Sequence, residues 1–101
     1  MKAQLQYHRK ITVVHANSLE TGVCELKVWK VPPSPDYPEG IKFSLFLVSR
    51  TTGQVLIGID NHKPKGPHIH HGSKELKYEF VDVESLVDDF WDRVRKEGFE
   101  L

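Results

Sequence analysis

The side chains best suited to chemistry gather in residues 60–71, which read Asp-Asn-His-Lys-Pro-Lys-Gly-Pro-His-Ile-His-His. Four of the six histidines of the chain lie between His62 and His71. Histidine changes charge near neutral pH, so it can give or take a proton under ordinary conditions. If the residues after Pro67 are extended, His68 and His70 project to one side of the chain. We therefore expect two imidazoles to face one shared space.

One hypothesis for this segment is metal-independent cleavage of RNA by general acid–base catalysis. One neutral histidine would take a proton from a ribose 2′-hydroxyl, and a second, protonated histidine would give one to the leaving 5′-oxygen. Lysines or backbone amides near Gly66 would offset the negative charge of the phosphorane. Asp60 or Asn61 would orient an imidazole. The predicted catalytic residues are His68, His70, Asp60, Asn61 and Tyr78.

Two other hypotheses stay open for the same residues. In the first, the segment is a polar turn, in which Asp60 and Asn61 cap backbone groups and the histidines are exposed. In the second, its His-x-His pair binds a metal. In the second case His62, His71 or Asp60 would complete a tetrahedral set. The sequence has no cysteine pair and no His-Glu-x-x-His motif, so it indicates no particular metal. We predict a site without a metal or other cofactor.

Strand-like patterns predict the elements that position this segment. Apolar residues alternate with polar ones over 5–13 and 24–29, and residues 41–48 and 54–60 are apolar at nearly every position. A short strand is expected over 77–80. The four prolines of residues 32–40 predict a surface loop between the second and third strands.

The last predicted element is an amphipathic helix over 82–97. Asp82 can cap its N-terminus, and Gly98 is a suitable stop. Its apolar stripe at helical spacing consists of Val83, Leu86, Val87, Phe90 and Val94. The predicted fold class is α+β: an antiparallel meander sheet of about five strands with the C-terminal helix packed on one face. Residues 1–101 are expected to form a single domain, which is mainly β over 1–80.

Length and composition limit the classes of protein to which the chain can belong. Its 101 residues, of which 39% are hydrophobic, suffice for one core. Its apolar runs are far shorter than the roughly 20 residues that cross a bilayer, and the first 15 residues lack the apolar centre of a secretory signal. The one cysteine, Cys24, lies among alternating apolar residues, which is typical of a buried thiol in a reducing compartment. We expect a cytoplasmic protein without a membrane segment.

The formal charge of the chain is zero overall but is unevenly distributed. Residues 1–80 carry 11 basic and 7 acidic residues, whereas residues 81–101 carry 3 basic and 7 acidic residues. On the outward phase of the predicted strands, lysines accompany Trp29 and Phe46, and such a surface can bind phosphates and stack bases. The two rings can instead pack under a helix, a loop or a second copy of the chain in a homodimer. The predicted contacts to RNA or phosphate are Lys42, Lys65, Lys63, Lys10, Lys27 and Trp29.

Several landmarks along the chain together resemble a known family. They are Val-Trp-Lys-Val-Pro at 28–32, Gly-Ile-Lys-Phe at 40–43, Asp-Asn at 60–61, Lys-Gly-Pro-His-Ile-His at 65–70, Tyr-Glu-Phe at 78–80 and Asp-Phe-Trp at 89–91. This set is similar to the TumE-type toxins of bacterial and archaeal toxin–antitoxin modules. The resemblance implies a small cytoplasmic toxin that blocks growth at translation and is neutralised by an antitoxin encoded beside it. At matching positions it indicates Lys42, Asp60, Asn61, Lys65, His68, His70 and Tyr78.

The leading prediction is therefore an RNA-directed toxin, with RNA or the ribosome and a cognate antitoxin as its partners. A non-catalytic module that binds RNA or protein through the basic face of the sheet is the alternative. The two differ in outcome, since a nuclease leaves cleaved RNA and a binding module retains intact RNA in a salt-dependent way.

Overall fold

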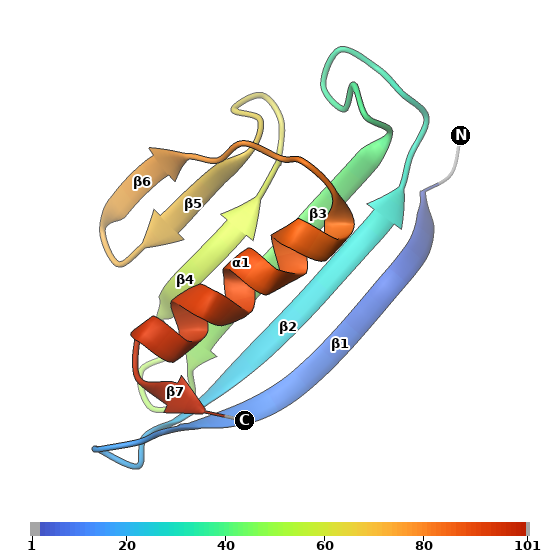
Figure 1. Cartoon of the computed structure of the whole chain (residues 1–101). Coiled ribbons are helices and arrows are strands. Elements are labelled where there is room, and N and C mark those ends of the chain that lie inside the picture. Colours follow the sequence, from blue (N-terminus) through green and yellow to red (C-terminus); the bar gives the residue numbers. More distant parts are fainter. Residues whose placement is uncertain (1–2, 101) are drawn as a thin grey trace.

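The strands of the chain follow one another as neighbours in an antiparallel sheet. The structure is a computed structural model that describes residues 3–100. Over that range a seven-stranded sheet has the order β6-β5-β4-β3-β2-β1-β7, and a helix lies across one of its faces (Figure 1). The elements are β1 (Gln4–His15), β2 (Thr21–Lys30), β3 (Ile41–Ser49), β4 (Val55–Asp60), β5 (His68–His71), β6 (Lys74–Lys77), α1 (Val83–Lys96) and β7 (Phe99–Glu100).

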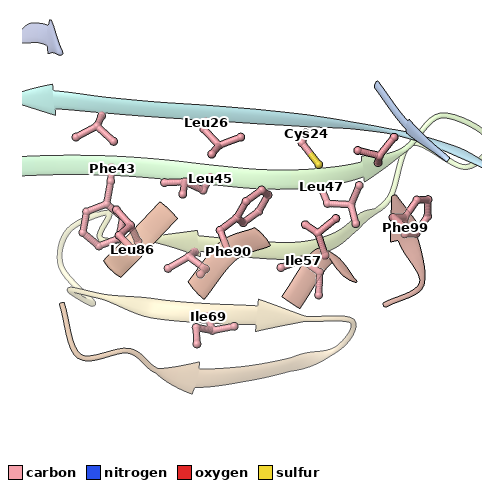
Figure 2. Close-up of a cluster of buried hydrophobic side chains, with 14 residues drawn as sticks. Cys24, Leu26, Phe43, Leu45, Leu47, Ile57, Ile69, Leu86, Phe90 and Phe99 are labelled. Atoms are coloured by element: carbon pink, nitrogen blue, oxygen red, sulfur yellow. The ribbon is translucent and has the colours of Figure 1, made fainter. Parts of the chain in front are cut away.

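The central strands β2 and β3 bury one face of the sheet. Cys24, Leu26 and Val28 of β2, together with Leu45 and Leu47 of β3, are at most 1% exposed. Successive side chains on a strand point to opposite faces, so this alternation places one whole face in the core. Figure 2 shows these side chains in one cluster with apolar residues of the neighbouring elements.

Helix α1 covers this buried face with the apolar stripe that the sequence predicts. Asp82 Oδ1 accepts a hydrogen bond from the Ser85 N–H at 2.7 Å, which caps the helix N-terminus. Leu86, Phe90 and Val94 are buried, and Figure 2 shows Leu86 and Phe90 among the core side chains of the sheet. The predicted helix over 82–97 and its packing on one face of an antiparallel sheet are confirmed, with the helix itself at Val83–Lys96.

After the helix the chain returns to its first strand. Gly98 adopts a positive φ of 98°, which glycine tolerates best, and turns the chain toward β1. Phe99 then pairs with His15, and its ring is 2% exposed and packs edge-on against the His15 imidazole. This short pairing connects the C-terminal part of the chain to the outer side of β1 (Figure 1).

The prediction of about five strands is wrong, because seven strands form within residues 3–100. It misses β5, in which Ile69 is the one apolar residue, and β7, which has two residues. The short strand expected over 77–80 lies instead at Lys74–Lys77, where all four residues are exposed and no alternation of burial marks the strand. Phe80 lies beyond the sheet ladder and stacks on Phe43 of the core.

No helix within residues 3–100 is long and apolar enough to span a bilayer.

Candidate functional site

Strand pairing gathers the candidate residues on the face of the sheet opposite α1. Asp60 at the end of β4 pairs with His68 of β5, and Gly58 pairs with His70 two positions along. Residues two apart on a strand share a face. The intervening Ile69 points into the core and is 4% exposed. The two imidazoles therefore face the same space, as the spacing of the histidines predicts.

Three side chains meet there at close range. His68 Nε2 lies 2.9 Å from His70 Nε2 and 3.1 Å from Asp60 Oδ1. Asp60 Oδ2 lies 3.9 Å from His70 Nε2. We call Asp60, His68 and His70 the histidine–aspartate cluster. Two ring nitrogens this close interact favourably when a proton or another positive charge lies between them.

The backbone fixes the orientation of His68. Its Nδ1 lies 2.7 Å from the carbonyl oxygen of Gly66, and because a carbonyl can only accept, Nδ1 donates this hydrogen bond. In the neutral ring the lone pair of Nε2 is then directed at Asp60 and His70. His68 is 7% exposed, whereas the His70 side chain is 34% exposed. His68 is thus held in place and His70 has room to move.

A glycine in the central strand β4 makes space for an aromatic contact to His70. The Phe46 and His70 rings are stacked, with 6.5 Å between their centroids and 24° between their planes. Phe46 pairs with Gly58 on the neighbouring strand, and any side chain at Gly58 would collide with the Phe46 ring. The ring can therefore extend across β4 toward the histidine.

A pocket of about 350 Å³ opens beside the cluster. Its lining combines the three cluster residues with the loop that precedes β5, and consists of Asp60, His62, Lys63, Pro64, Lys65, His68 and His70. Lys65 Nζ donates to Glu75 of β6 at 2.8 Å, and this hydrogen bond holds the pKa of Glu75 below its usual range. The Asp60 carboxylate also accepts from the His62 N–H at 3.2 Å, so it shapes the start of the same loop.

A family model for Toxin TumE matches residues 3–97, nearly the whole chain. The chain belongs to the TumE toxin family. Comparison with curated proteins and with solved structures gives no match. Membership of a toxin family implies a cognate antitoxin as a partner.

Two further pockets of this TumE-family protein lie on the face of the sheet opposite α1, which we call the open face; it carries the histidine–aspartate cluster, Lys10, Lys27, Trp29, Lys42 and Phe46. One, of about 240 Å³, adjoins the cluster through Asp60 and contains Lys42, whose Nζ lies 5.4 Å from the centre of the Trp29 ring. The other, of about 320 Å³, is lined by Lys10, Val23, Glu25, Lys27, Ser44, Phe46 and Val48. The predicted lysines and Trp29 are therefore on one surface with the cluster, and Phe46 connects the second pocket with His70.

Two predicted catalytic residues do not enter the cluster. Asn61 is buried, and its side chain accepts from the Phe43 N–H at 2.9 Å and donates to Ile41 O at 2.8 Å, so it ties the end of β4 to β3. Tyr78 lies on the helix side of the sheet, where its hydroxyl donates to Asp89 of α1 at 2.6 Å. Burial, followed by this hydrogen bond, raises the pKa of Tyr78.

The structure also narrows the candidate metal ligands. His71 points to the helix side and contacts Glu97 at 2.9 Å, whereas the histidine–aspartate cluster is a group within residues 3–100 whose ligand atoms all lie within 4.8 Å of one another. Sequence reasoning missed the part played by Gly58. The available signal was a glycine inside an otherwise apolar central strand, which commonly marks a close approach by another group.

Proposed function

We propose that this TumE-family protein is a toxin that binds RNA on the open face of its sheet and cleaves it at the histidine–aspartate cluster. The observation that carries the proposal is the 2.9 Å contact between His68 and His70, beside Asp60 and on the same face of the sheet as pockets that present lysines and aromatic rings. RNA supplies its own nucleophile, the 2′-hydroxyl, so proton transfer and charge stabilisation are what the protein must add.

His68 is the better-defined member of the proton-transfer pair. With Nδ1 bonded to Gly66 O, its Nε2 is the atom that accepts or gives a proton, and Asp60 stabilises the ring when it is charged. His70 supplies the second proton-transfer group. The attacking and leaving oxygens lie on opposite sides of the phosphorus, so His70 must rotate away from His68 when RNA binds. Its partial exposure allows this rotation.

The pockets beside the cluster suit the rest of a single-stranded RNA. Lys63 lines the pocket at the cluster, and Lys42 lies next to Trp29 in the adjoining one, where a phosphate and a base would find a cation and a ring face. A stacked base contributes about 1–3 kcal/mol to binding. Cleavage at the cluster and binding along the neighbouring surface therefore belong to one mechanism.

The test measures growth arrest and the cleavage of purified RNA by the His68→Ala and His70→Ala variants. Loss of a proton-transfer group is expected to lower the cleavage rate by about 100-fold or more. His71→Ala is the matched control, because His71 lies two residues from Ile69 on the other face, paired with Glu97. Cleavage by the wild type should persist in chelator.

A non-catalytic RNA-binding module is the competing outcome of the same experiment. It would retain intact RNA, with an affinity that falls as salt rises, and would leave no cleaved ends under any condition. Full toxicity of a folded protein lacking both His68 and His70 would refute the catalytic proposal.

A further inference from the structure

The histidine–aspartate cluster has the composition and shape of a divalent transition-metal site, and we propose that it binds Zn²⁺ through His68 Nε2, His70 Nε2 and one oxygen of Asp60. These three residues can supply the protein ligands by themselves, because their ligand atoms already lie within 4.8 Å of one another. A fourth position would face the adjoining pocket and accept water.

The distances fit a metal ion after small side-chain shifts. With Zn–N and Zn–O bonds of about 2.0–2.1 Å, the ligand atoms of a tetrahedral site are about 3.3 Å apart. His68 Nε2 lies 2.9 Å from His70 Nε2 and 3.1 Å from Asp60 Oδ1, both close to this value. The other oxygen of Asp60, Oδ2, lies 3.9 Å from His70 Nε2, so a small rotation of His70 or of the carboxylate would bring one oxygen within ligand distance of both nitrogens. His70 is the ligand with freedom to adjust, since its side chain is 34% exposed.

The surroundings of His68 match those of a metal ligand. Metal-binding histidines characteristically donate their second ring N–H to a backbone carbonyl or carboxylate, which fixes the tautomer and aims the lone pair. His68 Nδ1 makes such a bond to Gly66 O at 2.7 Å. The Asp60 carboxylate is likewise oriented, because it accepts from the His62 N–H at 3.2 Å.

The donor set selects the class of ion. Two imidazole nitrogens and one carboxylate oxygen suit Zn²⁺ and its neighbours in the first transition row, whereas Mg²⁺ and Ca²⁺ prefer sites made of oxygen. Strand β5 and the end of β4 are adjacent in the sheet, so the ligands come from a rigid part of the fold.

Metal binding has a consequence for activity that rests on the proposed function. The ion would occupy the lone pairs of both ring nitrogens, and those are the atoms that proton transfer requires. A Zn²⁺-loaded toxin is therefore expected to be inactive on RNA, and removal of the ion by a chelator should restore cleavage.

Zn²⁺ binding is best measured by calorimetry on the full chain after treatment with chelator, and Co²⁺ provides a spectroscopic probe of coordination geometry. One Zn²⁺ per chain is expected. His70→Ala and Asp60→Asn should each weaken binding by about tenfold or more, and Asn keeps the acceptor oxygen that faces the His62 N–H. His71→Ala and His8→Ala are the controls, because their imidazoles lie outside the cluster and contact Glu97 and Glu25.

The two proposals fail in different ways. Absence of Zn²⁺ binding, or binding that survives both His70→Ala and Asp60→Asn, overturns the metal site whether or not RNA is cleaved. Binding that depends on those residues establishes it, even if no RNA is ever cleaved. Cleavage that requires added Zn²⁺ would support the site and overturn the metal-independent mechanism.

Discussion

At the scale of single residues, the space above Gly58 controls how the site is arranged. Gly58→Ala would drive its new methyl group into the Phe46 ring, which stacks on His70. We expect a loss of about 1–3 kcal/mol in the free energy of unfolding, as for other overpacked positions, together with a displaced His70. Urea unfolding and the ring proton signals of His70 measure the two effects.

A smaller partner residue should rescue this variant. The double variant Gly58→Ala with Phe46→Leu is expected to regain much of the lost stability, because leucine leaves room for the methyl group. Equal stability losses in the single and double variants would show that the Phe46 contact does not cause the effect.

The buried thiol of Cys24 gives a second prediction at this scale. Burial raises the pKa of Cys24 from 9.0 to about 12, so at pH 8 the folded protein holds about a thousandfold less thiolate than an ordinary cysteine. We expect negligible reaction with a thiol reagent until urea unfolds the chain. Because the folded pKa lies above the unfolded one, Cys24 also makes the folded state less stable as the pH rises above about 9. Rapid labelling of the native protein would contradict this.

Residue chemistry explains which site predictions could be made from the sequence. The shared side of His68 and His70 follows from the two-residue period of a strand. The separation of Tyr78 from them does not, because Tyr78 lies just beyond the end of β6 at Lys77, where strand alternation no longer determines the direction of a side chain. The role of Asn61 was equally hidden, since its amide bonds to the backbone of β3, which lies 18 to 20 residues away in sequence.

At the scale of elements, the start of α1 depends on one exposed carboxylate. Hydrogen bonds from Ser85 hold the pKa of Asp82 below its usual 3.8. A lowered folded pKa means that the ionised carboxylate stabilises the helix above pH 3.8 and that this stabilisation is lost as the pH falls through the folded value. We predict a lower Tm for Asp82→Ala at pH 6, with a gap to wild type that narrows toward pH 2.

Asp82→Asn is the control for this prediction. Asparagine caps helices well but does not titrate, so its Tm at pH 6 should lie near that of the wild type. A gap between wild type and Asp82→Ala that stays constant from pH 6 to pH 2 would exclude a contribution from the charge of Asp82.

The strength of the local signal determined which elements the sequence revealed. α1 combines a cap, an apolar stripe and a glycine stop, and its predicted bounds lie within one residue of those in the structure. β6 has no alternation and β7 is two residues long, so both are defined by their partners, β5 and β1. Pairing between distant segments leaves little trace in a short stretch of sequence.

At the scale of the whole molecule, Phe99 connects the C-terminal strand β7 to the end of β1 at His15. Its ring is 2% exposed and lies in the core beside the sheet that α1 covers. Phe99→Ala is expected to lower the free energy of unfolding by about 3–5 kcal/mol, a large fraction of the stability of a domain this size. Chemical denaturation provides the measurement. Glu100→Ala, on the same strand but exposed, should leave stability nearly unchanged.

If RNA binds on the open face, the lysines of that face should determine how its affinity depends on salt concentration. Because the formal charge of the chain is zero, attraction to RNA must come from local groups. Lys10→Ala and Lys42→Ala should each reduce the slope of log affinity against log salt by about 0.7, as expected for one lost phosphate contact on a single strand. Filter binding or fluorescence anisotropy measures the slope. Lys96→Ala on α1 is the control, and an equal change there would argue against the open face.

Because α1 covers one face of the sheet, mutations that abolish growth arrest should act in two different ways. Alleles that escape growth arrest should divide by the side of the sheet they alter. Changes beneath α1 would remove toxicity by lowering the amount of folded protein in the cell, whereas changes to exposed side chains on the opposite side would leave abundance normal. Immunoblotting measures the abundance of each variant in a collection of escape mutants. The variants of normal abundance would then identify the surface that acts on the target, without any assay of the substrate.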